Sequence, residues 1–206
     1  MSENKTCFVI APIGEVDSDT RKRSDLVLKH VITPSVKDFG YKAVRADQIS
    51  EPGIITSQVI QSIVTAPLVI ADLTERNPNV FYELAIRHAI RKPLIQIIRK
   101  GEKIPFDLLG TRTIELDHKD LDSVEDVKKE IQNQITTLEE NLCTIENPIS
   151  ISIDLQLLRQ SENPEDRSLA DVLSAISELR TAIKNIEKRI SSSKQVYLPK
   201  IIQESM

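Results

Sequence analysis

The sequence predicts an α/β protein built on a doubly wound parallel sheet, and three observations lead to that prediction. Short apolar runs recur over the first 116 residues, at 7–12, 41–46, 66–72, 93–99 and 111–116. Longer amphipathic stretches separate them, and this alternation is typical of a parallel sheet covered on both faces. The chain has 206 residues, which is enough for one core of about 150 residues and an appendage.

Each apolar run is a predicted strand, and the stretches between the runs are predicted helices. Apolar residues at helical spacing precede Pro34, and further stretches of this kind cover 54–63 and 80–90. After the last strand, residues 123–141 carry an apolar stripe that would cover the remaining flank of the sheet. Because crossovers between parallel strands are right-handed, we expect a flavodoxin-like sandwich of three layers, with the α/β domain over 1–142.

The C-terminal part of the chain has a different pattern. Residues 143–166 contain two Asn-Pro pairs and a short alternating stretch, which predict a linker with one added strand. In the helical segment predicted over 167–206, apolar residues recur in steps of three and four, as in a coiled coil: Leu169, Val172, Ile176, Leu179, Ile183, Ile186 and Ile190. Three occupants could bury this seam: a second copy in a homo-oligomer, a partner protein, or the chain's own domain.

Composition argues against several classes of function. The 27 basic and 31 acidic residues give a net charge of −4 without a long basic stripe, so nucleic-acid binding is not expected. The N-terminus is polar and no apolar run approaches the ~20 residues that cross a bilayer, so we expect a cytoplasmic protein without a membrane partner. Cys7 and Cys143 lack a metal-binding spacing and the three histidines are scattered, so no metal or other cofactor is expected.

Polar loops follow four of the predicted strands. They are rich in Asp, Glu, Arg, Gly and Pro, as in RADQISEPG at 45–53 and DLTERNPN at 72–79. Solvent exposure alone explains any single loop of this kind. Ligands of open α/β sheets bind beyond the carboxyl ends of the strands, and all four loops should meet there. The sequence therefore predicts a binding site at that edge.

Several of these segments resemble one family. CFVIAPIG, the RSD at 23–25, the RAD at 45–47 and above all DLTERNPNVFYELAIRHA at 72–89 resemble the nucleoside 2-deoxyribosyltransferase-like proteins, which are related to N-glycoside-cleaving folds that include TIR domains. The resemblance covers about the first 116 residues. It implies that a glutamate near the start of a helix attacks or stabilises the anomeric carbon of a ribose while the base departs.

Glu83 occupies the position that matches this glutamate. It lies within the first two turns of a helix that Pro78 should begin and Asn77 should cap. Helix N-termini favour negative charge, so we expect an ionised carboxylate directed toward the crevice. The alternative is a helix-dipole glutamate without a chemical role, worth ~0.3–1 kcal/mol. Asp72 ends the third strand and could hold a ribose hydroxyl or supply a proton, or it could cap the following turn.

Further residues are predicted to bind substrate. Gly14 permits close backbone approach, Arg21 and Arg23 are cationic, and Ser24 could cap a helix whose free N–H groups attract phosphate. The predicted set comprises Pro12, Ile13, Gly14, Arg21, Arg23, Ser24, Arg45, Asp47, Asn77, Asn79 and Tyr82. For Arg45 and Asp47, a surface ion pair is an equal alternative.

The expected function is hydrolysis of an N-glycosidic bond in NAD or a (deoxy)nucleotide, with Glu83 and Asp72 as catalytic residues. Asn77 and Phe8 stand where the family often has an aspartate and a tyrosine, which weakens the case for base transfer in nucleoside salvage. An α/β domain of this resemblance, followed by an oligomerising segment, implies a bacterial anti-phage effector that assembly activates. The rival interpretation is a nucleotide-binding sensor without catalysis. His88 is expected to be structural.

Overall fold

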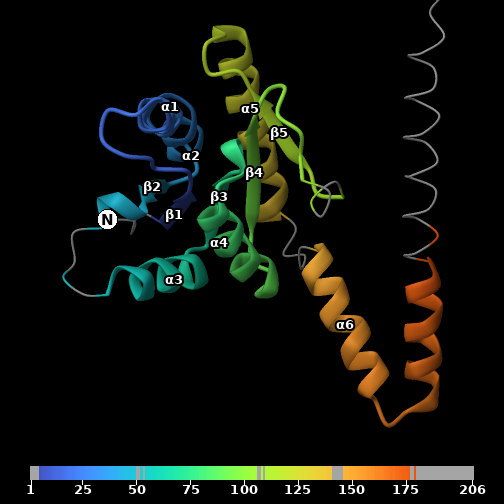
Figure 1. The fold of residues 1–206 in the computed structure, drawn as a ribbon. Helices are drawn as coiled ribbons and strands as arrows, with labels where there is room; N and C mark the ends of the chain where they lie inside the picture. The colour runs from blue at the N-terminus through green and yellow to red at the C-terminus, as the bar shows by residue number, and fades with distance from the viewer. Residues whose placement is uncertain are drawn as a thin grey trace, which may run out of the picture. The chain divides into compact units, whose positions relative to one another are not determined.

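The computed structural model of the chain describes residues 5–49, 52, 54–105, 108, 110–140, 146–176 and 179 (Figure 1). The chain divides into two compact units, Met1–Ile151 and Ser152–Met206. The first unit contains the sheet and every predicted site residue, and the second contains the start of the predicted seam.

A five-stranded parallel sheet forms the centre of the first unit. Its strands are β1 (Lys5–Ile10), β2 (Tyr41–Arg45), β3 (Leu68–Asp72), β4 (Leu94–Arg99) and β5 (Thr113–Leu116). They lie in the order β2-β1-β3-β4-β5, with every neighbouring pair parallel. Each predicted strand overlaps one of these, and the doubly wound order is confirmed. The winding changes direction beside β1, so the loops after β1 and β3 flank the switch point where ligands of such folds bind.

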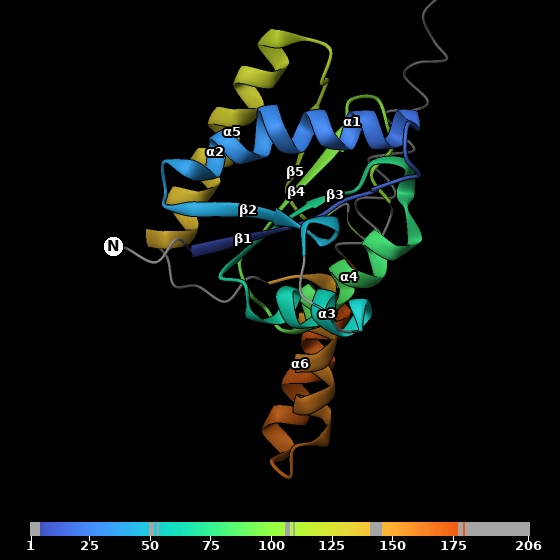
Figure 2. The same cartoon turned by 90° about the vertical axis from the view of Figure 1, so that its left-hand side faces the viewer.

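Helices cover both faces of this sheet (Figure 2). α1 (Asp19–Val27), α2 (Thr33–Lys37) and α5 (Leu121–Glu140) pack on one face, and α3 (Ile55–Thr65) and α4 (Pro78–Ala89) pack on the other. Two apolar cores result, one on each side, and Cys7 lies in the first as expected. The helix predicted before Pro34 continues through it to Lys37, because a π-helical turn at Leu28–Ile32 leads into α2 and places Pro34 in its first turn.

A fully buried arginine holds the α3–α4 layer together. The Arg87 side chain is 0% exposed and donates hydrogen bonds to the carbonyls of Ile63 (2.6 Å), Ala66 (2.8 Å) and Pro93 (2.8 Å). These carbonyls belong to the end of α3 and to the two turns that lead into β3 and β4; the carbonyl of Pro93 also accepts from the N–H of Val69 in β3 (3.1 Å). Burial lowers the pKa of Arg87 to about 10, which still leaves the guanidinium charged at neutral pH.

The chain beyond α5 differs from the sequence-based expectation. The strand predicted within 143–166 is wrong, because Pro148–Gln160 forms a helix, α6, and a further helical stretch covers 164–176. Its alternating apolar residues belong to a helix that is apolar on two faces, and the Asn-Pro pairs mark helix starts rather than breaks. The seam residues Ile183, Ile186 and Ile190 lie outside the described residues. None of the described helices is both long and apolar enough to span a membrane.

We predict that Arg87→Met lowers the free energy of unfolding by about 2–4 kcal/mol, because several buried carbonyls lose their donor at once. Urea denaturation followed by circular dichroism measures this loss. Arg112→Met is the matched control, since the Arg112 side chain is 78% exposed, and it should change the unfolding free energy by less than about 0.5 kcal/mol. Equal effects of the two substitutions would contradict the structural role of Arg87.

Candidate active site

The loops at the carboxyl edge of the sheet meet, as the sequence predicts. Thr20 at the start of α1 donates its hydroxyl hydrogen to Glu75 Oε2 in the loop after β3 (2.8 Å). The backbone N–H of Glu75 in turn donates to Glu102 Oε2 in the loop after β4 (2.8 Å). Arg21 Nη2 reaches Asp47 Oδ2 in the loop after β2 (2.8 Å). The four loops therefore form one connected polar rim.

The loop after β1 turns sharply at Gly14. Its φ is +68°, and a Cβ atom at this position would lie 2.6 Å from Ser18 Oγ, so no other residue fits without rearrangement. Pro12 is buried and Ile13 partly buried, which anchors the loop to the domain. Ser18, not Ser24 as predicted, caps α1 through a hydrogen bond from the N–H of Arg21 (3.1 Å).

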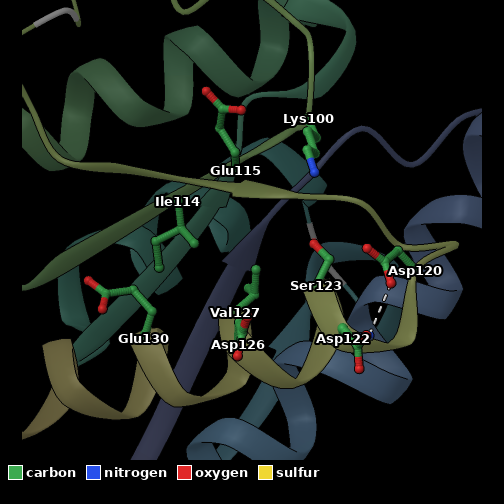
Figure 3. Close-up of a pocket in the computed structure, with 9 residues that line it drawn as sticks. All are labelled: Lys100, Ile114, Glu115, Asp120, Asp122, Ser123, Asp126, Val127 and Glu130. Atoms are coloured by element: carbon green, nitrogen blue, oxygen red, sulfur yellow. Dashed lines mark hydrogen bonds between the residues drawn. The ribbon is translucent and has the colours of Figure 1, made fainter.

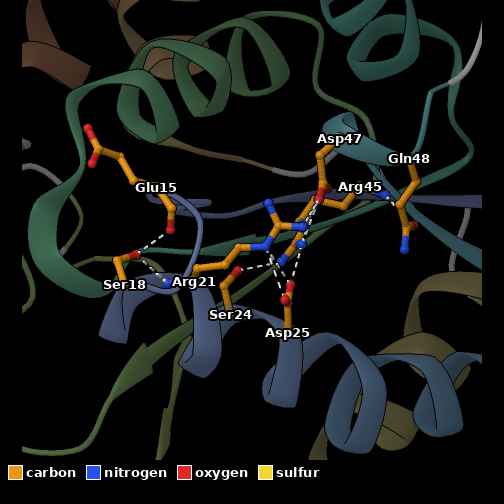
Figure 4. A network of polar contacts seen from close by, with 8 residues as sticks. All are labelled: Glu15, Ser18, Arg21, Ser24, Asp25, Arg45, Asp47 and Gln48. Carbon is orange, nitrogen blue, oxygen red and sulfur yellow. Dashed lines mark hydrogen bonds and ion pairs between the residues drawn. The ribbon is translucent and has the colours of Figure 1, made fainter.

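A paired charge network joins α1 to the end of β2 (Figure 4). Arg45, whose side chain is 2% exposed, donates to Ser24 Oγ (2.7 Å), Asp25 Oδ1 (2.5 Å) and Asp47 Oδ1 (2.6 Å). Arg21 also bonds both aspartates, with Nε 3.0 Å from Asp25 Oδ2. Arg21, Ser24, Arg45 and Asp47, all predicted site residues, are thus brought together. Asp25 was missed, although its i,i+4 spacing from Arg21 is a signal for such a pair.

The carboxylates of this network remain ionised to low pH. The hydrogen bond from Arg45 lowers the pKa of Asp47. Burial on its own would raise the pKa of Asp25, but hydrogen bonds from Arg45 and Arg21 outweigh it, and the pKa of Asp25 is lowered as well. Two arginines and two aspartates therefore compensate each other's charge within the protein. Neither arginine is left with an unpaired charge for a phosphate.

Arg23 and Asp72 form a second, buried pair. Arg23 Nη1 lies 2.8 Å from Asp72 Oδ2, and Nη2 lies 3.1 Å from Oδ1. Thr74 donates its hydroxyl hydrogen to Asp72 Oδ1 (2.5 Å) and accepts a hydrogen bond from Arg23 Nη2 (2.6 Å). Asp72 is 1% exposed. The sequence predicts that its side chain emerges at the crevice; the structure instead places it inside, with both oxygens occupied. Arg23 Nε, also buried, has no hydrogen-bond partner within the described part of the chain.

The loop after β3 carries backbone strain. Glu75 and Arg76 have φ values of +63° and +49°, a left-handed conformation that side chains other than glycine rarely adopt. Asn77 then caps α4 as predicted, with Oδ1 accepting from the N–H of Asn79 (3.0 Å), and Pro78 occupies the first helical position. Such strain persists where the surrounding contacts over-determine the backbone, here through Thr20 and Glu102. It fixes where α4 begins.

Glu83 differs from all these carboxylates because it has no partner among the residues that the structure describes. It is partly buried, and no side chain of the described residues forms a hydrogen bond or an ion pair with it. Desolvation alone raises the pKa of Glu83 to about 7. Burial therefore opposes the ionised carboxylate that the sequence predicts, and Glu83 is the sixth residue of α4, whereas the helix dipole acts mainly over the first turn. Its neighbour Tyr82 is 63% exposed, and Asn79 is exposed too.

His88 lies on a different flank of α4 from Glu83. It borders an apolar pocket of 190 Å³ with Phe81, Leu84, Ala85 and residues near Pro148. Burial lowers the pKa of His88 to about 4, and its Nε2 lies 3.4 Å from Gln96 Nε2. A neutral imidazole packed against Gln96 agrees with the structural role expected for His88.

A second cleft, of 480 Å³, lies between β5 and α5 (Figure 3). Acidic side chains dominate its lining, with Glu115 on β5 and Asp122, Asp126 and Glu130 on α5, opposed by Lys100. Among the described residues, no group of three or more His, Cys, Asp or Glu side chains is arranged to hold a metal ion. None of the predicted site residues borders this cleft, so it is separate from the polar rim.

Comparisons with known proteins give distant likenesses only. No protein-family model matches the chain, and no curated protein matches it. Among solved structures, the chain is similar to the Clostridium botulinum CMP N-glycosidase BcmB, with 19% identity and a TM-score of 0.40 over 61% of this chain and 98% of that one. It is also similar to the Francisella novicida lysine decarboxylase LdcF, with 15% identity and a TM-score of 0.41 over 80% of this chain and 21% of that one.

The Arg23–Asp72 pair should be strongly coupled. We predict that Arg23→Met costs about 3–5 kcal/mol of unfolding free energy, because it leaves a buried carboxylate without its cationic partner, and that Asp72→Leu has a similar cost. The double variant should lose much less than the sum of the two. A double-mutant cycle by urea denaturation measures the coupling, and additive losses would show that the pair is energetically unimportant.

Glu83→Gln should stabilise the fold at alkaline pH. The pKa of Glu83 is higher in the folded chain than in the unfolded chain, so ionisation of this carboxyl lowers the free energy of unfolding. This loss of stability is absent below the unfolded pKa near 4.5 and complete above about 7. At pH 8 we expect a gain of about 1–2 kcal/mol after allowance for partial solvation, or roughly 3–6 °C in Tm. At pH 4.5 the two proteins should melt together. A Tm difference independent of pH would contradict the raised pKa.

Proposed function

We propose that this protein cleaves an N-glycosidic bond in a nucleotide-type molecule, with water as the acceptor and Glu83 as the catalytic carboxylate. The observation that carries the proposal is Glu83 itself: a partly buried carboxyl with a pKa of about 7, unpaired among the described residues, on the helix that follows the central strand. Strongly perturbed pKa values cluster at functional sites, and this clustering supports the proposal.

The chemistry follows from the desolvation of Glu83. As the bond between sugar and base breaks, positive charge develops at the anomeric carbon. A carboxylate that has lost water and has no cationic neighbour is electrostatically unsatisfied, so it gains more from this charge than a solvated carboxylate would. As the base leaves with the electron pair of the broken bond, Glu83 can stabilise the cation or bond to the anomeric carbon. Water then attacks this carbon, releasing Glu83 where a bond had formed, and the proton that water loses balances the one that the base gains.

In this proposal the other polar residues position the loops rather than react. Asp72 holds Arg23 and Thr74, and Arg99 N–H donates to Thr74 Oγ1 (3.0 Å), which ties the end of β3 to that of β4. Arg45 and Arg21 fix α1 against the loop after β2. Held in this way, the rim can bind a flat base or a ribose without reorganising.

Two substrate classes and one rival function remain to be separated. NAD and (deoxy)nucleotides both contain the bond that Glu83 would attack, whereas a nucleotide sensor of the same fold would bind them unchanged. The paired state of Arg21, Arg23 and Arg45 favours recognition through the base and sugar, because none of these guanidinium groups offers an unpaired charge to a phosphate. Salvage by base transfer would need a second base in the same site.

The direct test incubates the purified protein with NAD, nucleotides and nucleosides and measures released base by chromatography. We predict release that falls below about a tenth of wild type in Glu83→Gln, a barrier increase above ~1.4 kcal/mol. Because the ionised form reacts, the rate should rise about tenfold between pH 6 and pH 8 and level off above that.

Glu125→Gln is the matched control, because Glu125 is an exposed carboxylate paired with Lys128 on α5. It should keep wild-type turnover and the same pH profile. Ligand binding without base release from any of these compounds would instead support the sensor. A rate that falls above pH 7 would mean that Glu83 acts as a proton donor.

A further inference from the structure

The described residues that line the apolar pocket beside α4 all belong to the first unit. The pocket has a volume of 190 Å³, and seven of these eight residues are apolar. Its inner end is formed by three buried side chains, Leu84, His88 and Leu108. At its outer end Ala85 is partly buried and Pro148 is exposed, so the pocket is accessible from solvent. Protein interiors contain few voids larger than a water molecule, which makes a space of this size an uncommon feature.

His88 is the polar residue of this lining, and two hydrogen bonds determine which of its ring nitrogens carries the hydrogen. Thr113 donates its hydroxyl hydrogen to Gln96 Oε1 (3.4 Å), so the oxygen of the Gln96 amide faces the threonine and the NH₂ group faces away from it. Gln96 Nε2 lies 3.4 Å from His88 Nε2, and an amide nitrogen can only donate. His88 Nε2 therefore accepts. Because burial lowers the pKa of His88 to about 4, the ring is neutral at pH 7 and its single hydrogen lies on Nδ1.

The Nδ1–H group of His88 is a donor without an acceptor among the described residues. The residue is 4% exposed, and its imidazole forms no other polar contact there than the one with Gln96. Gln96 does not line the pocket, so Nδ1 is the ring nitrogen left for a ligand. A water molecule at such a place needs about two to four polar partners, whereas His88 supplies the one polar side chain of the described lining. An unpaired buried donor is costly, and a ligand with an acceptor on an apolar body would remove that cost.

We propose that this pocket binds a small neutral molecule with one aromatic ring and one hydrogen-bond acceptor, which accepts from His88 Nδ1–H. An apolar cavity of about 150 Å³ can hold benzene, so 190 Å³ suits a single ring with a short substituent. Phe81 supplies an aromatic neighbour for the ring. No charged side chain occurs in the described lining, so a charged ligand would lose its hydration without compensation. A nucleobase has more polar atoms than one donor can satisfy, and the pocket is therefore independent of the proposed substrate site.

Titration of the full chain with acetophenone, followed by ¹H–¹⁵N NMR, tests the pocket. We expect saturable shifts centred on Leu84, Ala85 and Leu108, and at least tenfold weaker binding to Ala85→Leu, whose larger side chain fills the space. Ala89→Leu is the matched control, because Ala89 is an exposed alanine of the same helix, and it should bind as the wild type does. Circular dichroism checks the fold of both variants. Wild-type shifts that do not saturate, or that centre elsewhere, would overturn the proposal on their own, as would unchanged affinity in a folded Ala85→Leu.

A matched pair of ligands tests the hydrogen bond. In α-methylstyrene a CH₂ group replaces the carbonyl oxygen of acetophenone, so the shape is kept and the acceptor is lost. We expect the Kd of α-methylstyrene divided by that of acetophenone to fall about fivefold in His88→Phe, because the variant has no donor to reward the carbonyl. In the wild type, acetophenone but not α-methylstyrene should shift the ¹⁵N resonance of His88 Nδ1. Equal shifts with both ligands, or a Kd ratio that His88→Phe leaves unchanged, would overturn the role assigned to His88.

Discussion

The buried ion pair of Arg23 with Asp72 is the contact on which the carboxyl edge of the sheet depends. It joins α1 to the end of the central strand, and Thr74 extends it to the end of β4. Burying two charges is costly, and only bidentate geometry with additional hydrogen bonds offsets that cost. The pair therefore fixes the spacing between α1 and the sheet, and the loops after β1 and β3 take their positions from it.

Much of this could be predicted from the sequence. Five apolar runs with helical stretches between them specify the parallel sheet, and Asn77 followed by Pro78 specifies the start of α4. The Arg45–Asp47 ion pair, an alternative that the sequence offers, is present. Distant partners were harder, because a sequence does not show which carboxylates Arg21, Arg23 and Arg45 meet 20 to 50 residues away. Arg87 gave no signal, since its partners are backbone carbonyls that any sequence supplies.

The strand wrongly predicted in 143–166 has a physical explanation. A β-strand with an apolar residue at every second position and a helix that is apolar on two faces produce the same short pattern of apolar residues. Only the length of the segment distinguishes them. α6 has 13 residues, which is long for a strand, and Pro148 suits the first turn of a helix.

Burial accounts for the state of Glu83. A free guanidinium near the rim would favour the ionised carboxylate and lower its pKa, and the proposed site would then hold an ordinary solvated anion. No cation contributes to the raised pKa of Glu83, and burial acts on its carboxyl alone. The charge that an N-glycosidase needs to stabilise is positive and transient. In the proposed mechanism, a desolvated carboxylate that no cation neutralises is available for that charge.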